Sequence, residues 1–189
     1  MLESEKFKNM QNRKCYAYII AGVVFQTIII LVFALTVMRI KTPSVRLRAV
    51  TVQNLHYNAS ATSPYFNMTL IAEIAVKNKN FGHFRFDNST ASVTYGGTTV
   101  GDGELLKGRT SARKTKRVNV TMDVSSNGFS DSTELSNELN SGILRLSSQA
   151  NLRGKVTLMK VMKKRKTTKM NCTMSVDLDS SIVQILNCK

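Results

Sequence analysis

Hydrophobic and polar residues alternate along most of the chain after residue 44, which is the period of a half-buried β-strand. The clearest case is the segment 66–76 (FNMTLIAEIAV), where an apolar residue occupies every even position. Five other segments have strand-like patterns, namely 44–53, 89–97, 117–124, 144–158 and 170–178. Several short strands separated by turn-like residues predict a mainly β domain over residues 45–189, an antiparallel β-sandwich of about seven strands.

One short α-helix is expected among these strands. Asp131 is placed to cap it, and Glu134 follows three residues later, as in a capping box. Leu135 and Leu139 lie about one helical turn apart and share a face, and Gly142 is a typical residue at a helix end. We expect this helix to pack over one open end of the sheets.

An uninterrupted apolar segment precedes the β region. Residues 16–38 contain no charged residue, and Gln26 is their only strongly polar side chain. A helix of about 20 apolar residues crosses a bilayer. The alternative is a cleaved signal peptide, which has a shorter apolar core of about 7–15 residues and a small-residue cleavage site. The length of this segment favours an uncleaved signal anchor, with a cytosolic tail at 1–15 and a linker at 39–44.

The charges that flank the predicted span do not fix its orientation. Four basic residues precede it and four follow it, namely Lys6, Lys8, Arg13 and Lys14, then Arg39, Lys41, Arg46 and Arg48. The positive-inside rule needs an imbalance between the two sides, so it favours neither orientation.

Five N-glycosylation sequons do favour one orientation. They begin at Asn58, Asn67, Asn88, Asn119 and Asn171, and all of them follow the span. Four fall on outward positions of the predicted strands and Asn58 lies in a turn-like stretch, so each side chain can face solvent as a glycan requires. We therefore predict that residues 39–189 are extracellular at the plasma membrane, with the endoplasmic reticulum as the alternative membrane.

The three cysteines divide between the two sides of that membrane. Cys172 and Cys188 lie on the oxidising side, where a disulfide between them would close the last pair of strands. The alternative is two free thiols, one of them buried. Cys15 adjoins the span on the cytosolic side beside basic residues, which makes it a candidate for S-palmitoylation. Its alternative is an unmodified thiol.

The chain is strongly basic, with a net charge of +15 from 27 Lys and Arg against 12 Asp and Glu. Such a charge attracts anionic partners. Two basic clusters stand out, KKRK at 163–166, which is expected at a hairpin tip, and KGRTSARKTKR at 107–117, which contains no acidic residue. The candidate contact residues are Lys163, Lys164, Arg165 and Lys166, and Arg113, Lys114, Lys116 and Arg117.

The partner of these clusters would be an acidic polysaccharide, anionic lipid headgroups or an acidic protein. The alternative is a pair of solvated loops whose charge only opposes aggregation and edge-to-edge pairing. Because physiological salt screens charges beyond about 8 Å, a binding loop must touch its partner.

No motif for catalysis or metal binding is present, and we expect neither enzyme activity nor a cofactor. The two histidines, His56 and His83, lie far apart in the sequence and are expected to be ordinary packed or loop residues. The Gly-Asp-Gly sequence at 101–103 is expected to form a hairpin turn.

The segment from VKNKNFGHFRFDNSTASVTYGG through GDGELLKGRTSARKT resembles the central block of the plant late embryogenesis abundant group 2 proteins. These include the harpin-induced-like and non-race-specific-disease-resistance-like membrane proteins. LNSGILRLSSQANLRGKVTL and NCTMSVDLDSSIVQILNC are also similar, so the resemblance covers residues 45–188. It implies a fibronectin-like sandwich with one helix, a role in stress or defence at the plasma membrane, and no catalytic residues. The chain has Asn78-Lys79-Asn80 where the family usually has Asn-Pro-Asn, which predicts a less rigid turn.

Three functions are consistent with these features. The first is a non-enzymatic membrane protein that displays a binding module in stress or defence. The second is a lipid-handling domain with an apolar groove lined by Met68, Met122 and Met174, although methionine is more often core filler. The third is nucleic-acid binding by the basic run, which requires the domain to face the cytosol. The orientation that the sequons predict excludes this third function.

Overall fold

The computed structural model describes residues 2–127, 132–158 and 162–188, and for residues 2–14 and 132 it describes the backbone alone. The chain forms two compact units, Met1–Ile40 and Lys41–Lys189. The predicted helix cap Asp131 lies outside the described residues.

The first unit is one α-helix, α1 (Leu2–Val37). Its segment Cys15–Val37 is long and apolar enough to cross a membrane, with a mean hydropathy of 2.6. Thr27 and Thr36 donate their hydroxyls to backbone carbonyls of the preceding turn, at 2.8 and 2.7 Å, which suits a lipid environment that offers no other partner. A signal sequence near the N-terminus can also meet these criteria of length and hydropathy, so α1 indicates either an anchor or a signal sequence.

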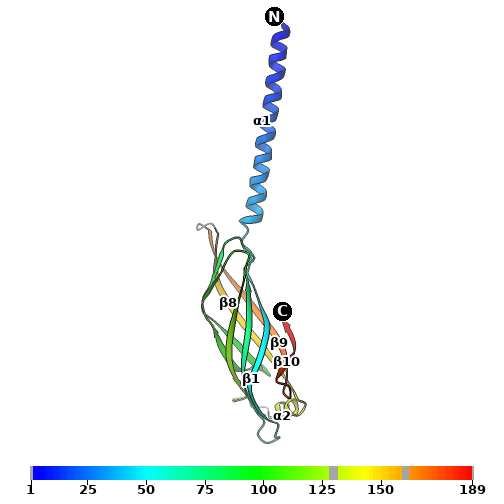
Figure 1. Ribbon diagram of the computed structural model, residues 1–189, viewed down its shortest axis with the longest axis vertical. Coiled ribbons are helices and arrows are strands. Elements are labelled where there is room, and N and C mark those ends of the chain that lie inside the picture. Colours follow the sequence, from blue (N-terminus) through cyan, green and yellow to red (C-terminus); the bar gives the residue numbers. More distant parts are fainter. Residues whose placement is uncertain (1, 128–131, 159–161, 189) are drawn as a thin grey trace. The chain divides into compact units, whose positions relative to one another are not determined.

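Over its described residues, the second unit is a β domain of ten antiparallel strands and one helix. Figure 1 shows their arrangement. The strands are β1 (Ser44–Asn58), β2 (Tyr65–Lys77), β3 (His83–Phe86), β4 (Ser89–Tyr95), β5 (Thr98–Leu105), β6 (Gly108–Thr110), β7 (Thr115–Ser125), β8 (Ile143–Leu158), β9 (Met162–Asp177) and β10 (Ile182–Cys188); the helix is α2 (Ser132–Asn140). All ten strands hydrogen-bond into one sheet, in the order β1-β2-β7-β5-β4-β8-β9-β10, and β8 also pairs with β3, which pairs with β6.

The domain is therefore mainly β and antiparallel, as predicted, but a sandwich of about seven strands is not confirmed. The successive strands β3 and β4 both pair with β8, and a corner in the chain separates them. Asn88 holds this corner, because its Nδ2 donates to Glu104 Oε1 at 2.9 Å and its Oδ1 accepts from the Lys107 amide at 2.7 Å. The alternation pattern missed β3 and β6 because they are only four and three residues long.

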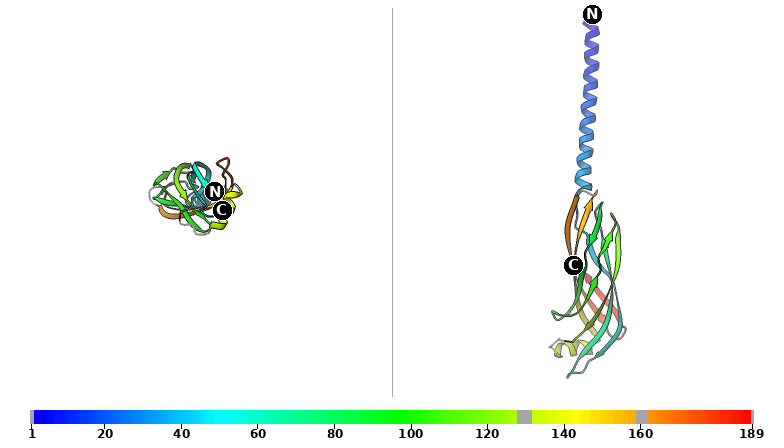
Figure 2. Two further views of the ribbon diagram at one scale, coloured as in Figure 1. Left: turned by 90° about the horizontal axis from the view of Figure 1, so that it is seen from below. Right: turned by 90° about the vertical axis from the view of Figure 1, so that its left-hand side faces the viewer.

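Alternate positions of the strands supply the core. Every even-numbered residue of β8 from Leu144 to Leu158 is buried, as is every even-numbered residue of β2. Phe66, Phe84 and Phe86 are among the largest fully buried side chains. Viewed end-on, the strands wrap around this core (Figure 2). The predicted inward parity of both strands is therefore confirmed.

Gly101 and Gly103 lie inside β5 rather than in a hairpin turn, which corrects the prediction for the Gly-Asp-Gly sequence. A Cβ atom on Gly101 would collide with the carbonyl oxygen of Asp123, and one on Gly103 would collide with the Met122 side chain. Both partners lie on β7, so the glycines are needed where β5 approaches β7 closely. The β4–β5 turn instead contains Gly97, whose φ of 83° favours glycine.

Helix α2 lies over one end of the β domain, as predicted (Figure 1). Leu135 and Leu139 are both buried, each with an exposed fraction of 2%. The helix ends at Asn140, and Gly142 in the following turn has a φ of 75°. On its other side, Ser136 Oγ donates to the carbonyl of Ala59 at 3.1 Å, which joins α2 to the loop between β1 and β2.

Two buried asparagines fasten the start of the β domain to its interior. Asn80 Oδ1 accepts from the Lys41 amide at 2.6 Å, and Asn80 Nδ2 donates to the Lys41 carbonyl at 2.8 Å. Asn78 Nδ2 donates to the carbonyls of Gly82 and Ser111 at 2.7 and 3.0 Å, and Asn78 Oδ1 accepts from the Asn80 amide at 3.0 Å. These contacts hold the turn without the proline that the family usually carries.

The predicted disulfide between Cys172 and Cys188 is present, and it joins residues that lie directly opposite one another on β9 and β10. Asp177 stands at the turn between these strands. Its carboxylate accepts from the Ser180 amide at 2.9 Å and from Gln184 Nε2 at 2.6 Å. The backbone N–H of Ser180 is the main reason that the pKa of Asp177 lies below its ordinary value.

Replacing Asn78 with alanine should lower the free energy of unfolding by about 3 kcal/mol, because the change leaves several buried backbone groups without a partner. Denaturant unfolding of the full chain in detergent, followed by circular dichroism, measures the loss. Lys79→Ala is the matched control, since its side chain is exposed, and it should change stability by less than about 0.5 kcal/mol. Equal losses in both variants would contradict this role for Asn78.

Replacing Cys188 with serine should lower stability by about 3 kcal/mol in the chain-entropy model of a short closed loop. Reductant should lower the melting temperature of the native chain but leave that of Cys188→Ser unchanged. Cys15→Ser is the control and should keep the sensitivity to reductant. If reductant leaves the melting temperature of the native chain unchanged, the disulfide does not stabilise the domain.

Candidate functional site

The basic run at 163–166 lies within strand β9 and not at a hairpin tip, which corrects the prediction. Strands β8 and β9 stay in register up to the pair formed by Leu158 and Met162, and the connecting residues 159–161 lie outside the described residues. Apolar alternation on β9 begins only at Met170, which is why the sequence pattern placed the strand start too late. Because side chains alternate along a strand, the odd and even residues of the run belong to different faces.

Four basic residues, one of them from this run, lie directly opposite one another across four neighbouring strands. Arg109 on β6 faces Arg85 on β3, and Arg85 in turn faces Lys155 on β8. Lys155 then faces Arg165 on β9. All four side chains are exposed. We call Arg85, Arg109, Lys155 and Arg165 the cationic row; with strands about 4.8 Å apart, it is about 14 Å long.

The cationic row is unfavourable for folding, because like charges directly opposite one another destabilise a sheet. The ion pairs found among the described residues, Arg117–Glu73 and Arg145–Glu138, lie elsewhere. Neighbouring charges in the row fall within the screening length of about 8 Å, so their positive potentials add. A local arrangement that opposes folding is most often found where a protein binds something, which makes the row a candidate site.

A hollow of about 490 Å³ adjoins the cationic row. Its lining comes from β3, β6, β8 and β9 and from the turn before β3, and consists of Phe81, Gly82, His83, Arg85, Arg109, Thr157 and Lys163. Phe81 is 49% exposed although it is a large apolar side chain. The hollow thus combines an accessible aromatic ring with three cations, Arg85, Arg109 and Lys163.

Arg113, a predicted contact residue, supports this aromatic ring. Its guanidinium carbon lies 4.8 Å from the centre of the Phe81 ring, within the range of a cation–π contact. Arg113 also donates its amide to the Asn80 carbonyl at 3.0 Å and its Nη1 to the Lys79 carbonyl at 3.1 Å. Arg113 is therefore fixed by several contacts of its own and holds the turn that presents Phe81.

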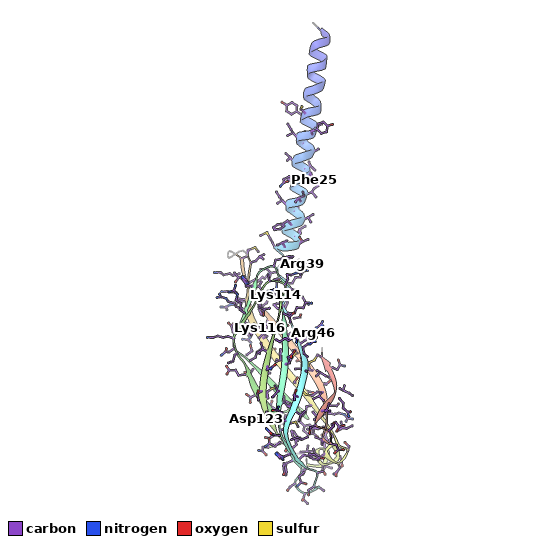
Figure 3. All side chains as sticks on the ribbon, viewed as in Figure 1. Phe25, Arg39, Arg46, Lys114, Lys116 and Asp123 are labelled. Carbon is purple, nitrogen blue, oxygen red and sulfur yellow. A yellow bond between two sulfur atoms is a disulfide. The ribbon has the colours of Figure 1, made fainter. Side chains whose placement is uncertain are left out.

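The remaining predicted residues of the second cluster lie near the start of β7. Figure 3 shows Lys114 and Lys116 near one end of the β domain and Asp123 further along that strand. Lys116 Nζ lies 6.0 Å from the ring centre of Phe86. Arg117 pairs with Glu73 of β2 at 3.5 Å, so a neighbouring strand supplies the acidic partner that the 107–117 stretch lacks.

All five sequon asparagines are exposed, as predicted from strand parity for Asn67, Asn88, Asn119 and Asn171 and from a turn-like stretch for Asn58. Asn88 differs from the others because both of its side-chain atoms hold the β3–β4 corner. The free cysteine, Cys15, is also exposed on α1. Glycosylation and acylation of these residues stay predictions.

The cavity beside the predicted methionines offers little room for a lipid. Met122 and Met174 line a cavity of only about 10 Å³, the space of about one water molecule, and Met68 is buried as well. His56 and His83 are both exposed on strands, the first on β1 and the second on β3. Within the ranges that the structure describes, no group of three or more His, Cys, Asp or Glu residues is placed to hold a metal ion.

Sequence reasoning missed Arg85 and Lys155, which form the centre of the cationic row. Each is a single basic residue at an outward position between buried neighbours, so neither belongs to a charge run. The alternation of the sequence shows that both residues point outward. It does not show that they lie opposite one another, because β3 and β8 are separated by more than fifty residues of chain.

Fold and surface together define an antiparallel β domain that follows an apolar helix and presents a line of cations. A family profile described as late embryogenesis abundant protein matches residues 73–174. A late embryogenesis abundant protein of Arabidopsis thaliana is 33% identical over 184 residues, which is 93% of this chain and 83% of that protein. The chain belongs to the late embryogenesis abundant family, of the group 2 type, as its sequence indicated.

Two solved structures are similar to parts of the chain at low sequence identity. One is the solution structure of an Arabidopsis thaliana protein, with a TM-score of 0.41 and 10% identity over 73% of this chain and 84% of that chain. The other is the solution structure of a late embryogenesis abundant protein, with a TM-score of 0.37 and 13% identity over 85% of this chain and 84% of that chain.

Replacing Arg85 with serine should raise the free energy of unfolding by about 0.5 kcal/mol, because it removes a charge that faces a like charge on each side. The gain should shrink at about 1 M salt, where the screening length falls to about 3 Å. Denaturant unfolding at low and high salt measures both effects. Arg46→Ser on β1 is the matched control and should show no such salt-dependent gain; a destabilised Arg85→Ser would contradict the argument.

Proposed function

We propose that this chain is a single-span membrane protein that holds a non-enzymatic β domain outside the cytosol, where the domain binds an anionic partner in stress or defence responses. Membership of the late embryogenesis abundant family supports the stress-related role. The observation that carries the binding activity is the cationic row of Arg85, Arg109, Lys155 and Arg165, in which exposed like charges face one another without an acidic partner among the described residues.

Three features support the location outside the cytosol. The Cys15–Val37 part of α1 has the length and hydropathy of a membrane span. All five sequon asparagines are exposed, so glycans can be attached to the folded domain. The disulfide between Cys172 and Cys188 is of a kind that persists in oxidising compartments. The plasma membrane is the proposed site, and the endoplasmic reticulum is the alternative.

Binding fits the surface better than catalysis or lipid handling does. The hollow beside the row is lined by cations, an aromatic ring and small polar groups, with no carboxylate among its lining residues. General acid–base chemistry there would have to rely on His83, which has no carboxylate partner in that lining. The interior cavity of about 10 Å³ gives no support to the lipid-handling alternative.

The location can be tested by glycosylation of the full chain expressed in a eukaryotic secretory pathway. We expect a glycosidase to increase its gel mobility in up to five steps, one for each sequon. Replacing the Ser or Thr of a sequon with alanine should remove one step. At the corner this means Thr90→Ala, which leaves the hydrogen bonds of Asn88 intact. Asn151→Gln is the control, because Asn151 begins no sequon, and it should change nothing.

An epitope tag at the N-terminus separates an anchor from a cleaved signal sequence. An uncleaved anchor keeps this tag on the glycosylated protein and keeps that protein in the membrane fraction. Protease added to sealed microsomes should remove the N-terminal tag and spare a tag at the C-terminus. A chain with no glycosidase-sensitive shift, whose C-terminal tag the protease removes, would place the β domain in the cytosol and overturn the proposal.

A further inference from the structure

We infer that the cationic row and the adjoining hollow bind an extended polymer of acidic sugars through its carboxylates. This inference names the partner of the proposed function and rests on it, because it takes the β domain to lie outside the cytosol. It depends on three observations, which are the linear arrangement of the charges, the chemistry of their side chains and the aromatic ring in the hollow.

The charges of the row form a line rather than a patch. Each of the four strands contributes one cation, and because neighbouring strands lie about 4.8 Å apart, the backbone positions of these cations repeat at that interval over about 14 Å. A small anion would contact one or two of these groups. A ligand that contacts all four must itself carry negative charges at intervals along a line. A linear polyanion has that property.

Three of the four cations are arginines, namely Arg85, Arg109 and Arg165. A guanidinium group presents a planar fork of N–H donors that matches the two oxygens of a carboxylate. The next outward position after Arg85 is Asp87, which directly follows the end of β3 and is also exposed. A broad anionic surface pressed on the sheet would be repelled by this carboxylate, whereas a chain laid along the row would pass beside it.

The hollow provides a contact that charge alone does not. Phe81 is half exposed, and Arg113 lies against its ring at 4.8 Å. An exposed ring of this kind offers a flat apolar face to the C–H groups of a sugar ring. Lys163 and His83 complete the same hollow with polar groups. An aromatic platform beside basic groups suits a partner whose carboxylates are carried by rings.

The proposed compartment favours such a polymer over a membrane surface. Anionic lipids give a negative potential to the cytoplasmic leaflet, which a domain outside the cytosol does not face. An acidic polysaccharide is a polyanion that extracellular spaces contain. Phosphatidylserine membranes are therefore the competing partner that the experiment must reject.

The test uses the full chain held in nanodiscs of phosphatidylcholine, and its probe is immobilised polygalacturonate. We expect binding that disappears at about 1 M salt, where charges are screened beyond about 3 Å. The double variant Arg85→Ser/Lys155→Ser should bind about tenfold more weakly or worse, because it removes two charge-assisted contacts. Arg46→Ser/Arg48→Ser removes the same charge from two exposed positions of β1 and should bind like the native chain.

Two further arms identify the source of the attraction. Fully methyl-esterified polymer keeps the sugar chain without its charges and should not bind. Phe81→Ala keeps every charge and should weaken binding about threefold through loss of the ring contact. Thermal unfolding of each variant shows that weaker binding does not come from unfolding, since the row variant should melt at or above the native temperature.

Three results would overturn the inference. One is polygalacturonate binding that the row variant retains. Another is an equal loss in the β1 control, which would show an effect of net charge alone. The third is binding to phosphatidylserine vesicles without binding to the polymer. Glycosylation and protease access decide the location separately. A glycosylated chain that does not bind the polymer contradicts only this inference. A chain that binds the polymer, carries no glycans and loses its C-terminal tag to the protease contradicts only the proposed location.

Discussion

The continuous pairing of strands β8 and β9 is the constraint on which the rest of the β domain depends. Every residue from Ile143 to Leu158 has a partner between Met162 and Asp177. Because the side-chain period of a strand is two, this single register decides the face of each residue on both strands. It buries Leu146 against Met174 and leaves Lys155 opposite Arg165 on the outside. A shift of one residue would put the charges into the core.

Particular side chains hold the other strands in place around this pair. On one side of β8, the corner held by Asn88 lets two successive strands share its length. On the far side of β9, the disulfide secures β10, whose strand partner among the described residues is β9 alone. At one end of the domain, Asn78 and Asn80 bond backbone groups that belong to three separate segments. Polar side chains and the disulfide thus hold the chain where the regular hydrogen bonding between strands ends.

The cationic row affects the stability of the fold in the opposite direction to these contacts. The buried asparagines stabilise the fold because their donors and acceptors are satisfied where water is excluded. The cationic row does the opposite, since its members repel one another in the folded state and are apart in the unfolded chain. Arg113 and Arg117 show that basic residues on this domain can be matched with a ring or a carboxylate. The row lacks such partners among the described residues, and an external anion would supply them.

The sequence by itself determined the apolar helix, the mainly β domain, the inward parity of the long strands, the face of α2 and the pair of cysteines, because each depends on local periodicity or on residue type. It placed the Gly-Asp-Gly sequence in a turn, since close contact with β7 is invisible along the chain. It began β9 only at Met170 for a similar reason: the residues that pair with the basic run lie on β8. Only the tertiary structure decided that Arg85, Arg109, Lys155 and Arg165 meet, because strand order is set by packing between distant segments.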